Sequence, residues 1–312
     1  MLAQRISSMN SISAICEATG ANIDEIALSI GMDPRIGEKY LKAGLGFGGS
    51  CFRKDVFSLI YLAESLHLEE VAAYWEQVLK MNEWQRTRFV KRIVKTLNGT
   101  LGGKKITILG YAFKKDTSDT RESPALEVIK ILLEDRPAEI AVYDPFCNPS
   151  VVREEVQRLV GNGVERVKVE SDPYSACEGS HAVIICTDCD EFKTVNPQID
   201  LRGKKRGSRD PRPFTRLTPN ESEILELHKF LASQTHMKDP LERFSPSPDC
   251  EEGCQKCRDG DGVVDVKKET ERFDWSRIAY RLEKPKWVFD GRGVVDKGFM
   301  AGLGVTVQGI GR

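Results

Sequence analysis

The sequence has almost no net charge, no long apolar segment and few histidines. Its 46 basic and 47 acidic residues nearly cancel, so no excess charge favours nucleic acid or a membrane surface. No apolar run approaches the roughly 20 residues that span a bilayer, and Gln4, Arg5 and Asn10 interrupt the start where a signal peptide would be apolar. The four histidines are isolated and suggest no site. We therefore expect a cytoplasmic protein without nucleic-acid, membrane or metal binding.

The nine cysteines are scattered through expected helices and strands, which indicates thiols and not a disulfide framework. Cys250, Cys254 and Cys257 come close to the spacing of metal ligands. A fourth cysteine or a histidine is missing nearby, so we do not expect a zinc site there. Cys186 and Cys189 have the spacing of a redox pair. They lie at an expected strand end and not at a helix start, which indicates coincidence.

The first third of the chain has the periodicity of helices. One helix ends at Gly20, and the next begins at Asn22 with Glu25 three residues on, as in a capping box. A long helix follows over about 68–97. We therefore expect residues 1–97 to form an all-helical domain.

The pattern changes to alternating strands and helices from Lys104. The apolar segments "KKITILGYAF", "AEIAVYD", "SHAVIICTD" and "KPKWVFDGR" predict strands, and "ESPALEVIKILLED" predicts an amphipathic helix. Strands this apolar fit a parallel sheet covered on both faces. Residues 98–202 and 271–312 are therefore expected to form a Rossmann-like α/β domain. Residues 203–270 lose periodicity and fill with charged residues, proline and serine, which predicts a disordered insertion.

The segment "LGFGGSCFRKD" places a cysteine just after a glycine-rich turn. Gly48 and Gly49 permit backbone conformations closed to other residues, Ser50 is a preferred N-cap, and "CFRKDVFSLIYLAESL" predicts a helix. Cys51 then falls in the first helical turn, where free amides and the helix dipole stabilise a thiolate. A small buried thiol at a helix start explains the spacing equally well, so both readings stay open.

Two charged residues near Cys51 fit the reactive alternative. Lys54 adds a cation close to the thiol. Asp55, four residues after Cys51, projects from the same helix face and is able to position water or shuttle a proton.

The cysteine segment "GFGGSCFRKD" resembles the active-site segment of the UDP-glucose 6-dehydrogenases. "NSISAICEATGANIDEIALSIGMDPRIG", "FKKDTSDTRESPA", "YDPF" and "VFDGR" are similar to that family in the same order and at similar separations. The resemblance covers residues 2 to about 200 and about 272 to 312. It implies NAD-dependent oxidation of UDP-glucose, through an aldehyde, to UDP-glucuronate.

The resemblance also implies roles for individual residues. Cys51 matches the nucleophile that adds to the aldehyde, and Asp55 matches a carboxylate that assists the water. Arg35 matches an arginine that reaches the substrate of a neighbouring subunit, which implies a homodimer through the helical domain, with a higher oligomer as the alternative. The other implied substrate-binding positions are Lys42, Ala43, Gly44, Leu45, Gly46, Phe47, Gly48, Phe113, Lys114 and Arg292. The implied cofactor-binding positions are Cys51, Phe52, Arg53, Lys54 and Arg121.

The sequence also departs from this family. The family begins with a Rossmann domain that holds NAD, and its catalytic lysine and a substrate-binding asparagine lie upstream of the segment that matches Leu2. We therefore expect a chain that corresponds to the carboxy-terminal two-thirds of such an enzyme, binds a UDP-sugar weakly and reduces no NAD alone. Two alternatives are a dehydrogenase of another nucleotide sugar, such as GDP-mannose or a UDP-N-acetyl sugar, and a non-catalytic oligomerisation or regulatory subunit.

Overall fold

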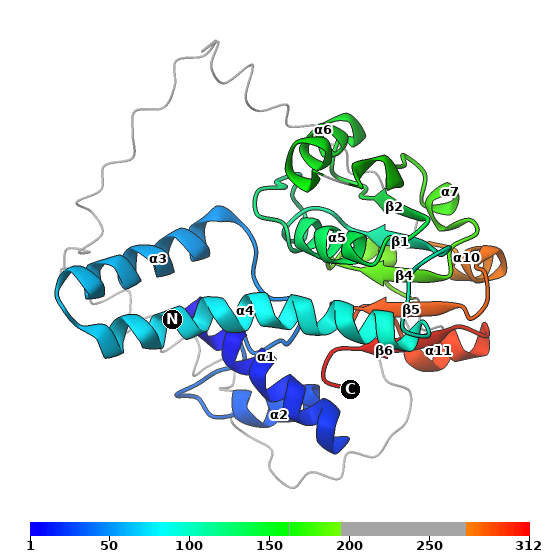
Figure 1. Cartoon of the computed structure of the whole chain (residues 1–312). Coiled ribbons are helices and arrows are strands. Elements are labelled where there is room, and N and C mark those ends of the chain that lie inside the picture. The colour runs from blue at the N-terminus through cyan, green and yellow to red at the C-terminus, as the bar shows by residue number, and fades with distance from the viewer. Residues whose placement is uncertain (162, 195–272) are drawn as a thin grey trace, which may run out of the picture. The chain divides into compact units, whose positions relative to one another are not determined.

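In the computed structural model, a group of helices precedes a parallel sheet along the chain (Figure 1). The structure describes residues 1–161, 163–194 and 273–312. The expected disordered insertion, 203–270, and the three cysteines within it lie outside these residues. The mixed α/β class predicted from the sequence is confirmed.

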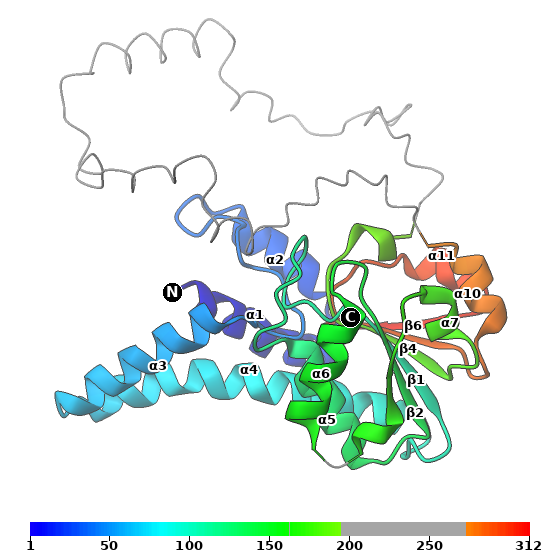
Figure 2. The ribbon, with the colours of Figure 1, turned by 90° about the horizontal axis from the view of Figure 1, so that it is seen from above.

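Four helices make up the first part, as the periodicity predicts: α1 (Leu2–Thr19), α2 (Ile23–Gly31), α3 (Ser50–Ser65) and α4 (Glu69–Thr96). Gly20 ends α1 in the left-handed conformation, with φ of 79°. Asn22 caps α2 by accepting a hydrogen bond from the Asp24 amide, and its amide nitrogen lies 3.4 Å from Glu25 Oε1. The expected helix ends are thus present, and α3 runs beside α4 (Figures 1 and 2).

Six parallel strands form the sheet, in the order β3-β2-β1-β4-β5-β6. The four expected strands are present, and two short edge strands were not predicted. Chain order reverses between β1 and β4, which is where doubly wound sheets bind ligands, outside the carboxyl ends of the strands. The strands are β1 (Lys105–Leu109), β2 (Glu139–Tyr143), β3 (Val167–Val169), β4 (Ala182–Ile185), β5 (Trp287–Asp290) and β6 (Thr306–Gly309).

Apolar cores cover both faces of the sheet, as the continuously apolar strands predict. The second half of α4 packs on one face together with α5 (Pro124–Glu134) and α6 (Pro149–Val160). The other face is covered by α7 (Pro173–Cys177), α10 (Trp275–Arg281) and α11 (Lys297–Gly302), and Figure 2 shows these two groups on opposite sides. Short 3₁₀ turns lie at η1 (Val164–Arg166) and η2 (Asp190–Phe192).

Helix α4 supports both parts of the described chain. Its first half packs on α1 and α3 around Val78 and Leu79, and its second half packs on the sheet through Phe89, Val90 and Ile93. Because the same helix packs on both parts, it connects the helices to the sheet. Among the residues described, no helix is long and apolar enough to cross a membrane.

A partly buried ionic cluster joins the ends of α1, α4 and β6. Glu17 on α1 forms ion pairs with Arg88 and Arg92 on α4, and it accepts the Gly311 amide at 2.7 Å. Burial raises the pKa of Glu17, but these hydrogen bonds and the nearby guanidinium groups outweigh it, so the net pKa lies below the ordinary value. Arg92 also donates to the carbonyl of Gly309, the last residue of β6.

We expect Glu17→Gln to lower the free energy of unfolding by about 2 kcal/mol at pH 7, because the two arginines lose their charged partner. A lowered pKa in the folded state stabilises the protein above the unfolded pKa of about 4.3, and this contribution is lost as pH falls through the folded value. The difference in free energy of unfolding between the unchanged protein and the variant, here called the deficit, should therefore shrink below about pH 4.3.

Urea unfolding of both proteins at pH 7 and at about pH 3.5 measures this deficit. Glu64→Gln, at an exposed position on α3, is the matched control and should leave the free energy of unfolding unchanged at both pH values. An equal deficit at both pH values would contradict the ionic origin of the stabilisation.

Candidate functional site

Two carboxylates shape the loops at the carboxyl ends of the central strands. Asp144, after β2, accepts hydrogen bonds from the amides of Tyr111 and Ala112 at 2.6 and 2.9 Å. These residues follow β1 and lead to Phe113, so the carboxylate fixes the direction of that loop. Its other oxygen accepts the amides of its own loop, at Phe146 and Cys147.

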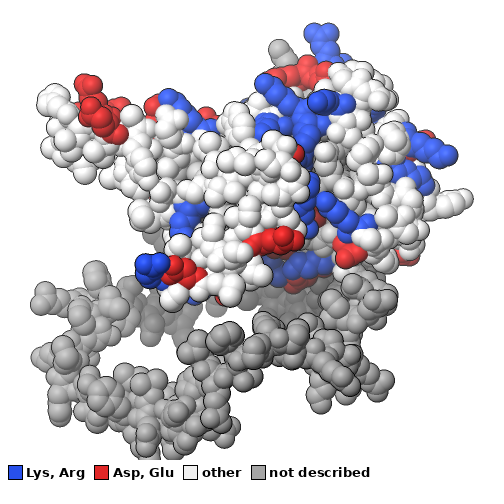
Figure 3. Space-filling view, turned by 90° about the horizontal axis from the view of Figure 1, so that it is seen from below, with Lys and Arg blue, Asp and Glu red and all other residues white. Residues whose placement is uncertain are grey.

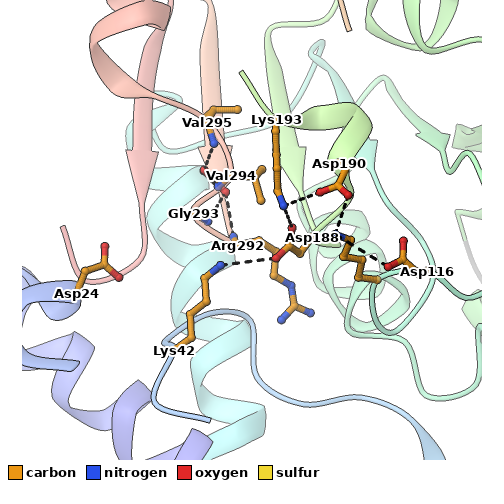
Figure 4. A network of polar contacts seen from close by, with 12 residues as sticks. Asp24, Lys42, Asp116, Asp188, Asp190, Lys193, Arg292, Gly293, Val294 and Val295 are labelled. Atoms are coloured by element: carbon orange, nitrogen blue, oxygen red, sulfur yellow. Dashed lines mark hydrogen bonds and ion pairs between the residues drawn. The ribbon is translucent and has the colours of Figure 1, made fainter. Parts of the chain in front are cut away.

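Asp290, at the end of β5, also fixes a loop by accepting hydrogen bonds from backbone amides. Its side chain is 2% exposed, and its two oxygens accept four amide hydrogens, from Arg292 to Val295, at 2.7 to 3.0 Å. Figure 4 shows these amides around the carboxylate. Arg292 is thereby held with its Nε 2.6 Å from the carbonyl oxygen of Cys186, at the end of β4. The carboxylate therefore fixes the guanidinium beside the switch point of the sheet.

The loop of residues 44–49, here called the glycine loop, packs against both of these strand-end loops. A Cβ on Gly44 would lie 3.0 Å from the carbonyl oxygen of Gly291, and one on Gly49 would lie 2.9 Å from the Phe113 ring. Gly49 has φ of 80°, as its predicted role requires. The prediction for Gly48 was wrong, since that residue does not have positive φ. It is a glycine because a Cβ would lie 2.6 Å from Pro124 Cδ.

Cys51 lies in the first turn of α3, as predicted, and its side chain is exposed, which the sequence left open. The prediction that Ser50 caps this helix was wrong: α3 begins at Ser50, and Gly49 occupies the cap position without a side-chain hydrogen bond. The positive φ of Gly49 turns the chain into the helix one residue earlier than a serine cap would. Asp55 follows one turn later and is exposed, with no hydrogen bond or ion pair to another described residue.

Arg121 lies close enough to Cys51 for the two charges to interact. Its guanidinium forms a bidentate pair with Asp119, at 2.6 Å for the shortest contact, and is 72% exposed. The pKa of Arg121 is raised first by the hydrogen bond to Asp119, and a Cys51 thiolate raises it further. The exposed end of α3 therefore has a cation beside its thiol.

A cleft with a volume of about 180 Å³ opens between the glycine loop and the end of β4. Lys42 Nζ lies 3.7 Å from Asp188 Oδ2 at this cleft, and Arg292 lines it too (Figure 4). Burial lowers the pKa of Arg292, yet the group keeps its charge at neutral pH because an arginine starts so high. The cleft is lined by Ile6, Tyr40, Lys42, Ala43, Gly44, Gly46, Asp188 and Arg292.

A chain of ion pairs runs from this cleft to the surface (Figure 4). Lys193 Nζ lies 3.3 Å from Asp188 and 2.6 Å from Asp190, and Asp190 also binds Lys115 at 2.7 Å. The hydrogen bonds from Lys115 and Lys193 lower the pKa of Asp190 to about 2. These pairs anchor Asp188, which in turn contacts Lys42.

Basic side chains also gather in a band across the middle of one face of the molecule (Figure 3). A surface of this kind attracts anionic ligands more than the near-zero net charge suggests. Among the described residues, no group of three or more His, Cys, Asp or Glu side chains is arranged to hold a metal ion.

The structure gathers some of the sequence-predicted residues at the cleft and leaves others outside its lining. Lys42, Ala43, Gly44, Gly46 and Arg292 line the cleft. The Leu45 and Phe47 side chains are buried in apolar cores, so only their backbone faces the loop's polar partners. Arg35 forms a pair with Asp33, is 88% exposed and does not line the cleft.

The remaining predicted residues lie around Phe113 and along α3. Lys114 Nζ is 5.3 Å from the centre of the Phe113 ring. Phe52 packs edge-on against Phe47, and Arg53 lies 3.6 Å from Glu83. Lys54 is exposed.

Sequence reasoning missed two groups of residues at this site. Tyr40 and Asp188 line the cleft, but no local pattern marks either of them. Asn82, Gln85 and Arg86 are buried beneath the glycine loop. Their spacing of three and four residues on the apolar face of a long helix was a usable signal, because polar residues there need buried partners.

Comparison with known proteins identifies two domains of one family. Residues 1–84 match the family model described as the UDP-glucose/GDP-mannose dehydrogenase family, central domain, and residues 107–216 match its UDP binding domain. UDP-glucose 6-dehydrogenase of Bos taurus is 55% identical over 203 residues, which are 62% of this chain and 40% of that protein. The Drosophila melanogaster enzyme of the same name is 52% identical over 61% of this chain and 41% of its own length.

Solved structures agree with these matches. A UDP-glucose dehydrogenase from Pyrobaculum islandicum is 35% identical with a TM-score of 0.52, covering 60% of this chain and 40% of its own. A UDP-D-ManNAc dehydrogenase from Pyrococcus horikoshii aligns over 99% of this chain and 49% of its own with a TM-score of 0.58. At 18% identity the latter shows the shared fold alone. The chain spans about two fifths of the length of the curated relatives it matches.

We expect Cys51 to be alkylated faster at pH 7 than any other described cysteine. Burial raises the pKa of Cys177, Cys186 and Cys189 to about 12, and three pKa units correspond to roughly 10³-fold less thiolate. Cys16 and Cys147 are buried as well. Timed labelling with iodoacetamide followed by peptide mass mapping gives each rate, and faster labelling of any of these five in the folded protein would refute the expectation.

Proposed function

Because the chain belongs to the UDP-glucose/GDP-mannose dehydrogenase family, we propose that it contributes the cysteine loop and nucleotide-sugar domain of an enzyme that oxidises UDP-glucose to UDP-glucuronate with NAD. One observation carries the proposal: the glycine loop that leads into exposed Cys51 packs directly against Phe113 and Gly291, beside Arg292. The same loop thus connects the proposed nucleophile with residues proposed to bind the nucleotide sugar. The relatives that are 52% and 55% identical to this chain over the aligned residues support UDP-glucose over another nucleotide sugar.

The cleft is proposed to bind the UDP-sugar. Lys42 and Arg292 provide two cations at its lining, and cations of this kind suit a diphosphate. Phe113 and Lys114, after β1, extend the site toward Cys51. The backbone of Ala43, Gly44, Leu45, Gly46, Phe47 and Gly48 is proposed to lie along the nucleotide sugar.

Cys51 is proposed to act after the C6 alcohol has become an aldehyde. The Sγ thiolate adds to the C6 carbonyl carbon, and the resulting thiohemiacetal alkoxide loses a hydride from C6 as its C–O bond becomes the thioester carbonyl. Water then attacks the thioester carbonyl, the C–S bond breaks, and the thiolate leaves as the carboxylate forms. Asp55, exposed one turn after Cys51, is proposed to orient this water and accept its proton.

NAD, when bound, supplies the hydride acceptor for both oxidations. The residues of this chain that would face it are Cys51, Phe52, Arg53, Lys54 and Arg121, whose cations suit a pyrophosphate. They form one wall of a cofactor site and not a complete one. None of the described strands is followed by the G-x-G-x-x-G turn that binds a dinucleotide pyrophosphate.

A homodimer through the helical domain is also proposed. Arg35 is exposed outside the cleft of its own chain, where it is free to reach the cleft of a neighbouring subunit. Helix α3 exposes Phe57, Tyr61 and Leu62, and an apolar surface of this kind favours contact with another protein. Light scattering of the purified chain at micromolar concentration tests it, and a mass of one chain at all concentrations would contradict it.

We expect residues 1–312 to bind UDP-glucose weakly, and Arg292→Ala to weaken that binding at least about 10-fold, because one diphosphate partner is removed. Calorimetric titration measures both affinities. Arg277→Ala is the matched control, since Arg277 stacks on Tyr174 away from the cleft. Equal affinity of the Arg292 variant and the unchanged protein would contradict the assigned cleft.

We also expect no steady NADH formation when NAD and UDP-glucose are added to residues 1–312. Without a complete cofactor site the nicotinamide is not held against C6, and such orientation contributes on the order of 7–11 kcal/mol to lowering the barrier. Absorbance of NADH is the measurement. Steady formation that Cys51→Ala abolishes would show that this chain alone suffices for the reaction.

A further inference from the structure

Four polar side chains lie buried beneath the glycine loop. Asn10 comes from α1, and Asn82, Gln85 and Arg86 come from α4; their exposed fractions are 0%, 4%, 0% and 6%. Burying such groups is unfavourable unless hydrogen bonds replace those to water. Each of the four side chains forms at least one hydrogen bond with the backbone of the glycine loop, and these bonds explain why the side chains are buried.

Asn82 and Arg86 hold the middle of the loop. The Phe47 amide donates to Asn82 Oδ1 at 2.9 Å, and Asn82 Nδ2 donates to the Phe47 carbonyl at 3.0 Å. Arg86 donates to the same carbonyl at 2.6 Å and to the Leu45 carbonyl at 3.2 Å. Burial lowers the pKa of Arg86 to about 10, so the guanidinium stays charged at neutral pH and both bonds are charge-assisted.

Asn10 and Gln85 hold the start of the loop. The Gly44 amide donates to Asn10 Oδ1 at 2.9 Å, and Gln85 Nε2 donates to the Gly44 carbonyl at 3.1 Å. The amide nitrogen of Asn10 is buried without a partner among the described residues. An unsatisfied amide destabilises the fold, so an asparagine at this position is explained by its bond to Gly44.

The loop needs this support because it has no secondary structure and four glycines. Gly46 and Gly49 have φ of 85° and 80°, and glycine loses more conformational freedom on ordering than any other residue. A Cβ on Gly46 would lie 2.1 Å from Asn82 Oδ1. Glycine at that position is therefore what allows the asparagine to reach the backbone.

We propose that Asn10, Asn82, Gln85 and Arg86 are positioning residues, which fix the glycine loop so that Cys51 and the cleft keep their geometry before any ligand binds. None of them lines the cleft, and the loop continues through Gly49 directly into the helix that carries Cys51. Small misplacements of reacting groups lower rates strongly, which gives the support a function beyond stability. The ligand in this inference, UDP-glucose, rests on the proposed function; the support of the loop does not.

The experiment compares Asn82→Asp and Arg86→Lys in the full chain with Arg92→Lys as the matched control. In Asn82→Asp the carboxylate still accepts the Phe47 amide, but the donor to the Phe47 carbonyl is lost. In Arg86→Lys the charge is kept, but the planar guanidinium that donates to two carbonyls at once is lost. Arg92 lies further along α4, binds Glu17 and the Gly309 carbonyl, and does not contact the glycine loop. Gln85→Met, which removes the bond to Gly44 and the bonds that Arg88 donates to Gln85 Oε1, is a third variant should the first two fold poorly.

The readouts are hydrogen exchange of the peptide covering residues 42–50, the alkylation rate of Cys51 and calorimetric affinity for UDP-glucose. We expect the loop variants to speed exchange of this peptide at least about 10-fold, to change the Cys51 rate and to weaken binding about 10-fold. The control should lower thermal stability without changing any of the three.

Equal changes in control and loop variants, or unchanged loop exchange in both loop variants, would overturn the inference. Failure of the unaltered chain to bind UDP-glucose would count against the proposed function alone, since exchange and alkylation test the support of the loop without a ligand.

Discussion

The hydrogen bonds between buried side chains and the backbone of the glycine loop are the constraint on which the described site depends. A loop without secondary structure must still satisfy its amides and carbonyls, and here α1 and α4 supply the partners at Gly44, Leu45 and Phe47. The absence of side chains at the glycines lets the same loop touch Phe113 and Gly291 on its other side. Cys51 and the cleft thus take their positions from one short stretch of backbone.

Helix α4 makes that arrangement possible. Its polar residues Asn82, Gln85 and Arg86 face the loop, and the turns that follow pack on the sheet through Phe89, Val90 and Ile93. The ionic cluster around Glu17 holds α1 and the end of β6 to the same helix. The loop and the strand ends it meets are therefore held by one support, which limits how far Cys51 and Arg292 can move apart.

Much of this fold was predictable because its signals are local. The helices follow from apolar periodicity and from the ends marked by Gly20 and Asn22, and four strands follow from continuous apolar runs. The edge strands β3 and β6 were missed because they have three and four residues and only partly buried side chains. Ser50 was assigned as a cap because serine prefers that position, whereas the left-handed Gly49 already turns the chain.

The site was predictable only where its signals are local in the sequence. Cys51 stands in a recognisable segment, and its position in the first turn of α3 matches what that segment predicts. Asp188 could not be found, since only the fold brings it together with Lys42, and no local pattern marks Tyr40. The spacing of the polar residues on α4 indicates buried side chains, but their partners in the loop are more than 30 positions away, and no sequence spacing reveals these contacts.

The central claim is that the thiol of Cys51 and the cleft beside Arg292 belong to one nucleotide-sugar site. The most direct test is the alkylation rate of Cys51 in the folded chain, measured with and without millimolar UDP-glucose. A bound nucleotide sugar that reaches from the cleft to α3 covers the thiol, so the account predicts slower labelling of Cys51 and unchanged labelling of the buried cysteines. A Cys51 rate that UDP-glucose leaves unchanged, at concentrations where calorimetry shows binding, would contradict it.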